Sequence, residues 1–328
     1  MAKLKLGVIG SNFVSDWLCE AALTLENFEL SAVYSRTAEK GSAFAEKHGI
    51  PRVYTDMESF LSSDIDAVYI ASPNKLHATQ TIDARSHGKH VHCEKPIASN
   101  LREYRAMKEC AEKNGLVLLE AMRPAFDPAL ETVRENLPRI GRIRRASFEF
   151  CQYSSRYDKY REGTILQAFD PSFSNAAVMD IGVYPIHFCL RLFGKPANGI
   201  TSKSVILENG FEGSGEIILP YDGFSAVISY AKTFDSVTPS FISGEDGSIL
   251  IDKMSCPEKL TFVPRKGEAE EIPFDFRENN MVFELSEFVR LIEKGEYVNS
   301  HAEFTYLETE LLDTVRAQNA IVFPADLQ

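Results

Sequence analysis

The feature that most constrains the fold is a repeated alternation of short apolar runs with amphipathic stretches over the first 120 residues. Such alternation is typical of βαβ units, in which helices join parallel strands and cover the sheet. It predicts an N-terminal α/β domain with a doubly wound parallel sheet. The predicted strands are Leu4–Ile9, Leu30–Tyr34, Arg52–Tyr54, Ala67–Ile70, His90–Cys93 and Val117–Glu120, and the predicted helices are Ser15–Leu25, Thr37–His48, Met57–Ser62, Leu76–His87 and Leu101–Asn114.

The alternation stops after residue 122, and strand patterns then follow one another with few helices between them. This order predicts an α+β second domain with a large, open, mostly antiparallel sheet. We divide the chain into residues 1–122 and 123–328, and expect the helix at 303–321 to pack back on the first domain. The predicted strands are Ile143–Tyr153, Thr201–Leu207, Glu216–Leu219, Phe224–Tyr230, Phe241–Ser243, Ile249–Asp252, Leu260–Val263 and Glu271–Phe274, and the predicted helices are Pro128–Asn136, Ala176–Phe193, Met281–Glu293 and Glu303–Ile321.

Composition and charge exclude several classes of partner. The 328 residues include 35 basic and 47 acidic side chains, a net charge of −12, and no basic run that could follow a phosphate backbone. No apolar stretch approaches the roughly 20 residues that span a bilayer, and the basic N-terminus runs directly into a strand pattern. The six cysteines are scattered without a C-x-x-C pair, which indicates reduced thiols. We expect a cytoplasmic protein that binds a small molecule, without affinity for nucleic acid or membrane.

The turn after the first predicted strand is a candidate phosphate site. Free N–H groups and the positive end of the next helix dipole face an anion at such a turn, where doubly wound folds bind the pyrophosphate of a dinucleotide. The G-x-G-x-x-G/A fingerprint becomes Gly10-x-Asn12-x-x-Ser15, and Asn12 is expected to form the tight turn because asparagine tolerates positive φ. A plain strand-to-helix turn is the alternative. The candidate cofactor-binding residues here are Gly10, Ser11, Asn12, Phe13 and Val14.

The end of the second strand bears on the choice between NAD and NADP. An acidic residue that binds the ribose 2′-hydroxyl is usual at this point in NAD enzymes, but this chain has Ser35 and Arg36. A hydroxyl and a guanidinium suit a 2′-phosphate, so the sequence favours NADP, with NAD as the second choice. The alternative is that Ser35 caps the next helix and Arg36 is only solvated.

Two further segments lie at the carboxyl ends of predicted parallel strands, the edge at which such sheets bind ligands. One contains Ser72, Pro73 and Asn74, followed by His77; the other is Cys93-Glu94-Lys95-Pro96. The ammonium of Lys95 could bond a substrate oxygen and stabilise developing negative charge. The alternative is a surface pair of Lys95 with Glu94 beside a helix-starting proline.

Four motifs in this order resemble the Gfo/Idh/MocA family of oxidoreductases, over nearly the whole chain. They are Gly-x-x-Gly-Ser ending at Ser11, Ser-Pro-Asn-x-x-His ending at His77, Gly-Lys-His-Val-x-Cys-Glu-Lys-Pro ending at Pro96, and Met-Asp-Ile-Gly-Val-Tyr-Pro-Ile-His ending at His187. The resemblance implies a nucleotide-binding Rossmann domain and a C-terminal domain with an open sheet. It also implies hydride transfer between nicotinamide and a secondary alcohol or carbonyl of a sugar, polyol or diol.

The resemblance also implies roles for single residues. The family's catalytic lysine falls on Lys95, its aspartate on Asp180, and its acid/base position on Tyr184, with His187 as a further candidate on the same helix face, since the three are spaced i, i+4, i+7. The alternative is a helix packed by Tyr184 and capped by Asp180. The sequence departs from the family pattern at Ser174-Asn175-Ala176-Ala177, and the segment after the sixth strand offers Arg123 as a cofactor-binding residue.

Other hypotheses are weaker. His90-x-His92-Cys93 lacks further residues at metal-ligand spacing, so we predict no metal site. A regulator that binds the nucleotide without catalysis is the alternative function, and Lys95, Asp180 and Tyr184 argue against it. Relatives often associate through the sheet of the second domain, so a homo-oligomer through that sheet is expected.

Overall fold

A computed structural model describes residues 3–327, and the chain divides into two compact units. The first contains residues up to 121 together with 279–306, and the second contains residues 122–278 and those from 307 onward. The C-terminal helix α11 (His301–Gln318) begins in the first unit and continues in the second. The predicted division, by contrast, left 279–306 entirely in the second domain.

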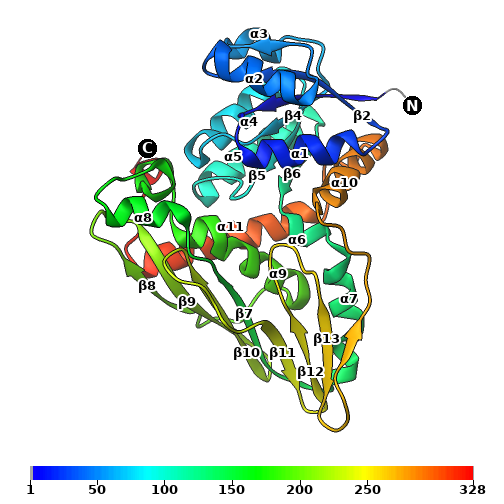
Figure 1. Cartoon of the computed structure of the whole chain (residues 1–328), viewed down its shortest axis with the longest axis vertical. Coiled ribbons are helices and arrows are strands. Elements are labelled where there is room, and N and C mark those ends of the chain that lie inside the picture. Colours follow the sequence, from blue (N-terminus) through cyan, green and yellow to red (C-terminus); the bar gives the residue numbers. More distant parts are fainter. Residues whose placement is uncertain (1–2, 328) are drawn as a thin grey trace. The chain divides into compact units, whose positions relative to one another are not determined.

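The first unit has the predicted six-stranded parallel sheet (Figure 1), and its strand order is β3-β2-β1-β4-β5-β6. This is the strand order of a dinucleotide-binding doubly wound fold. Its elements are β1 (Leu4–Ile9), α1 (Phe13–Leu23), β2 (Phe28–Tyr34), α2 (Ala38–His48), β3 (Val53–Tyr54), α3 (Met57–Leu61), β4 (Ala67–Ile70), η1 (Asn74–Leu76), α4 (His77–Ser86), β5 (His90–Glu94), α5 (Leu101–Asn114), β6 (Leu118–Ala121) and α10 (Met281–Lys294).

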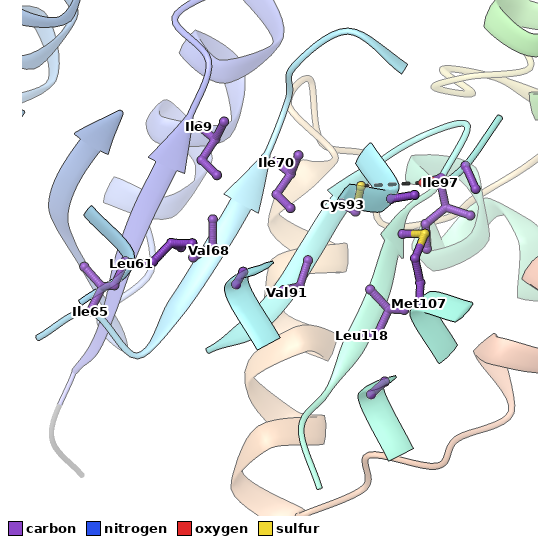
Figure 2. Close-up of a cluster of buried hydrophobic side chains, with 14 of the residues drawn as sticks. Ile9, Leu61, Ile65, Val68, Ile70, Val91, Cys93, Ile97, Met107 and Leu118 are labelled. Atoms are coloured by element: carbon purple, nitrogen blue, oxygen red, sulfur yellow. Dashed lines mark hydrogen bonds between the residues drawn. The ribbon is translucent and has the colours of Figure 1, made fainter. Parts of the chain in front are cut away.

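Buried aliphatic side chains of neighbouring strands form the core of this unit (Figure 2). Ile9, Ile70 and Val91 are at most 1% exposed, because strands with helices on both faces of their sheet are buried on both faces. Met107 of α5 packs against the same cluster. The strands therefore form a rigid frame, and the loops at their carboxyl ends are anchored to it.

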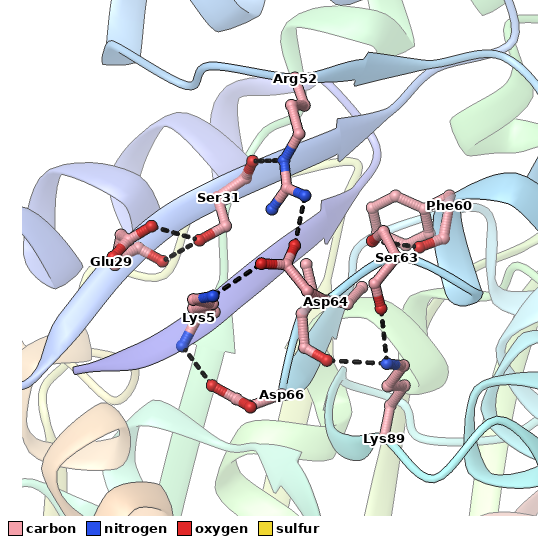
Figure 3. Close-up of polar contacts among 10 residues, drawn as sticks. Lys5, Glu29, Ser31, Arg52, Phe60, Ser63, Asp64, Asp66 and Lys89 are labelled. Carbon is pink, nitrogen blue, oxygen red and sulfur yellow. Dashed lines mark hydrogen bonds and ion pairs between the residues drawn. The ribbon is translucent and has the colours of Figure 1, made fainter. Parts of the chain in front are cut away.

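Polar contacts concentrate at the opposite edge of the sheet, where the strands begin (Figure 3). Asp64 accepts hydrogen bonds from the ammonium of Lys5, at 2.6 Å, and from the guanidinium of Arg52. These two cations lower the pKa of the exposed Asp64 carboxyl to about 2. Lys89 donates to the backbone carbonyls of Ser63 and Ile65, at 2.8 Å each. Each of these charged groups is paired within the fold, and none of them is a predicted site residue.

The second unit has an eight-stranded sheet in the order β14-β13-β12-β11-β7-β10-β9-β8, with one parallel pair, β7 with β10. The predicted mostly antiparallel sheet is confirmed. The strands are β7 (Ile143–Cys151), β8 (Thr201–Ile206), β9 (Glu212–Tyr221), β10 (Phe224–Ala231), β11 (Ser240–Gly244), β12 (Gly247–Ile251), β13 (Leu260–Pro264) and β14 (Glu270–Ile272), and the helical segments are α6 (Arg123–Phe126), α7 (Pro128–Asn136), η2 (Leu137–Ile140), α8 (Ser155–Arg161), η3 (Gln167–Phe169), η4 (Pro171–Phe173), η5 (Val178–Gly182), α9 (Val183–Phe193) and η6 (Pro324–Leu327).

The helix predicted at Ala176–Phe193 is two segments, because η5 is a π-helical turn that precedes α9. In the first unit, α10 packs beside α1, and the Asn279 side chain donates to the Trp17 carbonyl at 2.8 Å. Within residues 3–327 no helix combines the length and the apolar character that a membrane span requires.

A buried histidine in the core of the first unit makes the stability of the fold depend on pH. His92 of β5 is fully buried, stacks on the Phe288 ring at 5.3 Å, and lies 3.8 Å from a Glu284 carboxylate oxygen. Burial lowers the pKa of His92 from 6.5 to about 3. In the folded state His92 therefore stays neutral at pH values at which the same histidine is already protonated in the unfolded chain.

We predict that His92→Phe makes the protein less sensitive to acid. Because the folded pKa lies below the unfolded value of 6.5, the stability linked to His92 is complete above pH 6.5 and is lost as the pH falls toward about 3. Urea unfolding of wild type and variant from pH 7.5 to 4.5 measures the effect. His87→Gln is the matched control, since the pKa of His87 is raised. Equal acid sensitivity of wild type and His92→Phe would contradict the prediction.

Candidate active-site residues

The turn after β1 approaches the neighbouring strand so closely that only glycine fits at position 10. Gly10 has a φ of +105°, and a Cβ there would lie 2.7 Å from the Ala71 carbonyl oxygen. L-residues with side chains rarely adopt this backbone conformation, and the contact with a backbone oxygen could not relax cheaply. The structure thus gives the reason for a glycine at position 10, and its contact with a phosphate stays a prediction.

The structure corrects the predicted conformation of Asn12. Its φ is −111°, in the extended region, and the residue is the N-cap of α1 instead of a positive-φ turn. Its carboxamide oxygen accepts from the N–H groups of Val14 and Ser15, at 3.0 and 3.1 Å, and its amide donates to the Ala71 carbonyl at 2.8 Å. Asn12 thus ties the start of α1 to the end of β4.

These contacts leave an open turn at the positive end of a helix. Ser11, Asn12 and Phe13 are exposed and Val14 is half-buried. The aligned peptide dipoles of α1 place partial positive charge at this end, which favours a bound phosphate. An exposed glycine turn next to a helix N-terminus fits the pyrophosphate of a dinucleotide.

The end of β2 carries an exposed guanidinium. Arg36 is exposed, and within residues 3–327 it forms no hydrogen bond or ion pair. Ser35 is 7% exposed and lies beneath Gly41. The alternative in which Ser35 caps the next helix is wrong, because the N-cap of α2 is Thr37. Arg36 is therefore the accessible charge that a 2′-phosphate would meet.

The Glu94-Lys95-Pro96 segment is held by buried partners. The Glu94 carboxylate accepts from the Tyr69 phenol at 2.6 Å, and the peptide bond between Lys95 and Pro96 is cis. Just beyond, the Ile97 N–H donates to Glu120 at 3.0 Å. Lys95 itself is half-buried at the carboxyl end of β5. Glu94 is 8% exposed and bonded to Tyr69, so it is not a surface carboxylate as the alternative assumed.

His77 joins the two loops that flank this segment. One ring nitrogen lies 2.9 Å from the Pro96 carbonyl and the other 2.8 Å from the Ser72 carbonyl, and the residue is 1% exposed. Burial lowers the pKa of His77. A neutral imidazole donates to one carbonyl at a time, so His77 connects the two loops through one N–H, and its contact with a nucleotide stays a prediction. Pro73 and Asn74, both half-buried, lie at the clamped end of β4.

In the second unit, Asp180 lies in the π turn η5 and is bound by a lysine. The ammonium of Lys232 is 2.5 Å from an Asp180 carboxylate oxygen, and the Asp180 side chain is 40% exposed. The N-cap of the turn is Ala177. The alternative in which Asp180 caps the helix is therefore wrong. Single π turns inside helices occur frequently at functional sites.

The other predicted residues of this helix differ in exposure. Tyr184 is half-buried, with its ring 5.5 Å from that of Phe150. His187 is 3% exposed, and its Nδ1 lies 2.5 Å from a buried Glu308 carboxylate oxygen. Tyr184 is thus accessible from outside the core, whereas His187 contacts α11. Arg123 begins α6 and is half-buried.

Comparison with known proteins agrees with the sequence motifs. Residues 4–122 match the model of an oxidoreductase family with an NAD-binding Rossmann fold, GFO_IDH_MocA. The chain is 42% identical over 326 residues to scyllo-inositol 2-dehydrogenase (NADP(+)) IolU of Bacillus subtilis, covering 98% of this chain and 99% of that one. The chain belongs to the Gfo/Idh/MocA family of oxidoreductases.

Further members are more distant. A trans-1,2-dihydrobenzene-1,2-diol dehydrogenase of Mus musculus is 28% identical over 343 residues, covering 98% of this chain and 99% of the mouse protein. A solved structure of a 3-ketoreductase from Actinomadura kijaniata, in complex with NADP and TDP-benzene, has a TM-score of 0.85 at 22% identity. It covers 97% of this chain and 98% of its own, and at this identity it supports the fold alone.

Three buried charged residues of this family member were not singled out from the sequence. Glu120 holds the backbone after Lys95, Lys232 binds Asp180, and Glu212 accepts the N–H of Val178 at 2.8 Å. A charged residue within an apolar strand pattern is the available signal, because such residues are buried only when they are paired. The signal does not name the partner, which lies far away in sequence.

We predict that Asn12→Ala lowers the free energy of unfolding by about 1 kcal/mol, the usual cost of losing an N-cap. Loss of the tether to Ala71 should also weaken NADPH binding about tenfold, or about 1.4 kcal/mol. Urea unfolding and fluorescence titration measure the two effects. Asp56→Ala is the matched control, because Asp56 caps α3 by accepting from the Ser59 N–H at 2.8 Å. NADPH affinity that falls equally in both variants would contradict a specific role of Asn12.

Proposed function

We propose that this family member transfers hydride between NADP and a secondary alcohol, or its ketone form, of a polyol or sugar. The observation that carries the proposal is the placement of Lys95 at the carboxyl end of a parallel strand, next to a loop held by His77 and Glu120. The whole-length similarity to a protein named as an NADP-dependent inositol dehydrogenase supports the substrate class.

The bound nicotinamide supplies the hydride acceptor or donor. Lys95 then bonds the reacting oxygen and stabilises the negative charge that develops on it. Tyr184 takes the hydroxyl proton in oxidation and returns it in reduction. Asp180 accepts from substrate hydroxyls and orients the ring. His187 is buried against Glu308 and contributes to the helix instead of the proton transfer.

We also propose NADP as the preferred coenzyme, with NAD as the weaker one. Arg36 is exposed at the end of β2, and no acidic residue stands there to repel a 2′-phosphate. A guanidinium binds a phosphate through two parallel charge-assisted hydrogen bonds. Ser11, Phe13 and Val14 would contact the pyrophosphate, and Ser72, Pro73, Asn74 and Arg123 remain candidate cofactor contacts.

The association of two copies through the eight-stranded sheet belongs to the same proposal. Ile218 of β9, with Val205 and Ile206 of the edge strand β8, is exposed by 46%, 59% and 43%. Exposed aliphatic side chains on a sheet are suited to pack against a second copy of the chain.

The six cysteines are free thiols, which supports a reducing, cytoplasmic location.

We predict that Lys95→Ala lowers kcat at least about a hundredfold on any polyol that the wild type oxidises, because charge stabilisation of this kind is worth two to three orders of magnitude. The measurement is reduced-nicotinamide absorbance with scyllo-inositol and related polyols. Lys113→Ala, which removes an exposed lysine at the end of α5, is the control. Wild-type turnover by Lys95→Ala would refute the role. Binding of NADPH by the wild type, without turnover of any polyol, would favour a non-catalytic regulator.

We predict that Arg36→Ala weakens NADPH binding by about ten- to a hundredfold and leaves NADH binding unchanged, since a charged hydrogen-bonded pair contributes about 1.5–3 kcal/mol. Isothermal titration with both coenzymes gives the two affinities. The NADPH loss should shrink as salt rises, because Arg36 is exposed and its charge is screened. A parallel loss of NADH affinity would show that Arg36 does not read the 2′-phosphate.

A further inference from the structure

Lys232 combines burial with a fixed backbone. It directly follows β10 and is 4% exposed. Its N–H donates to the Gly213 carbonyl at 2.9 Å, and its carbonyl accepts from the Ser154 N–H at 3.0 Å. The main chain of Lys232 is therefore fixed from two sides, and its side chain starts from a defined point.

The ammonium of Lys232 has one carboxylate partner and apolar walls. It lies 2.5 Å from an Asp180 oxygen and 3.3 Å from the Ala168 carbonyl, and it is 5.0 and 5.5 Å from the ring centroids of Phe169 and Phe211. Burying an ammonium costs free energy unless it is paired, and ring faces and a carboxylate supply that compensation. The charge of Lys232 is thus directed at Asp180.

The π turn that carries Asp180 is itself held by a second set of buried groups. Glu212 accepts from the Val178 N–H at 2.8 Å and from the Tyr230 phenol at 2.7 Å. The Tyr230 ring packs so closely on Gly182 that a Cβ there would lie 2.9 Å from it. Both ends of the turn are therefore fixed by β9 and β10, the two strands whose ends carry Gly213 and Lys232.

We propose that Lys232 is a positioning residue for hydride transfer, which keeps the Asp180 carboxylate ionised and in one orientation toward the substrate hydroxyls. The inference rests on the proposed function, because the orientation of Asp180 matters for the reaction only if a polyol binds beside it. Asp180 is 40% exposed on its side chain while Lys232 is buried, so the substrate meets the carboxylate and the lysine acts through it.

The other titratable groups around the turn do not take this role. Glu212 and Tyr230 bond each other inside the sheet, and burial raises the pKa of each. Tyr184 lies on the next turn of the helix and is assigned to proton transfer. Lys232 brings a positive charge to within 2.5 Å of the Asp180 carboxylate. Removing that charge should raise the pKa of the Asp180 carboxyl, because an adjacent cation favours the ionised form.

The test is the pH profile of kcat/KM for Lys232→Met in the full-length protein with NADP and scyllo-inositol. We expect the acid limb, where kcat/KM falls as the carboxyl is protonated, to move up by about one pH unit or more, which is about tenfold in kcat/KM at a pH below both limbs. The loss should therefore shrink as the pH rises through the limb and be small above it. Lys232→Arg, which keeps the charge, should retain the wild-type acid limb.

Arg316→Met is the matched control for the loss of a buried cation. Arg316 is also 4% exposed, lies 4.5 Å from the Phe323 ring centroid, and pairs with Asp313 and Asp326. Its loss should lower stability without moving the acid limb. If Lys232→Met does not fold, Lys232→Gln carries the same test, because the amide is neutral and fills the same space.

Two results are decisive against the inference. A loss in Lys232→Met that is equal at every pH would show a structural role alone, and an unchanged rate would show no role. Either result, with normal wild-type turnover, leaves the proposed function intact. If the wild type itself turns over no polyol with NADP, the proposed function fails first.

Discussion

The parallel pairing of β1 with both β2 and β4 is the constraint on which the rest of the nucleotide end depends. Three backbone or side-chain contacts continue this pairing beyond the strands: Gly10 N–H to the Tyr34 carbonyl at 3.4 Å, Ala71 N–H to the Ile9 carbonyl at 2.9 Å, and the Asn12 amide to Ala71. The chain reverses its direction of strand addition here, which is the point at which doubly wound folds bind their ligands. The position of Arg36 and Lys95 follows from the same frame.

The second unit solves a different physical problem, the burial of charge. Glu212 is fully buried and has three partners, the Val178 N–H, the Tyr230 phenol and the hydroxyl of Ser204. Such a carboxylate adds little to stability, because its desolvation cancels much of the gain from its hydrogen bonds. Glu212 does favour one backbone arrangement. If the Val178 N–H of the π turn were bonded to another group, the buried Glu212 carboxylate would lose one of its partners.

Local sequence patterns predicted the helices and strands that bury one regular face. They failed where contacts with distant residues determine the bounds of an element. β1, β4, α5 and α7 have the predicted bounds, because apolar period and capping residues agree there. β9 begins at Glu212 instead of the predicted Glu216, since Gly213 and Gly215 weaken a strand pattern. Those glycines are required: a Cβ on Gly215 would collide with the Tyr230 phenol. The short helix α8 was missed because no residue in it is buried.

The same division applies to the site. Lys95 and the Gly10 turn were predicted from residues next to them in sequence, because a strand end fixes where the adjacent residues lie. The partner of Asp180 was not predicted, since Lys232 is 52 residues away and is brought to the π turn only by the pairing of β9 with β10. The predicted positive φ of Asn12 was wrong, because the side-chain hydrogen bonds of an N-cap outweigh the tolerance of asparagine for positive φ.

Under the proposed function, the pair of buried Lys232 and half-exposed Asp180 also marks a place where catalysis lowers the stability of the fold. An apolar residue of similar volume at position 232 would avoid the desolvation of an ammonium, and replacements of this kind often leave stability unchanged or higher. Packing alone therefore does not require a lysine between Phe169 and Phe211. Under the proposed function the requirement comes from Asp180, whose carboxylate would have to stay ionised when substrate covers it and removes the water that otherwise solvates its charge.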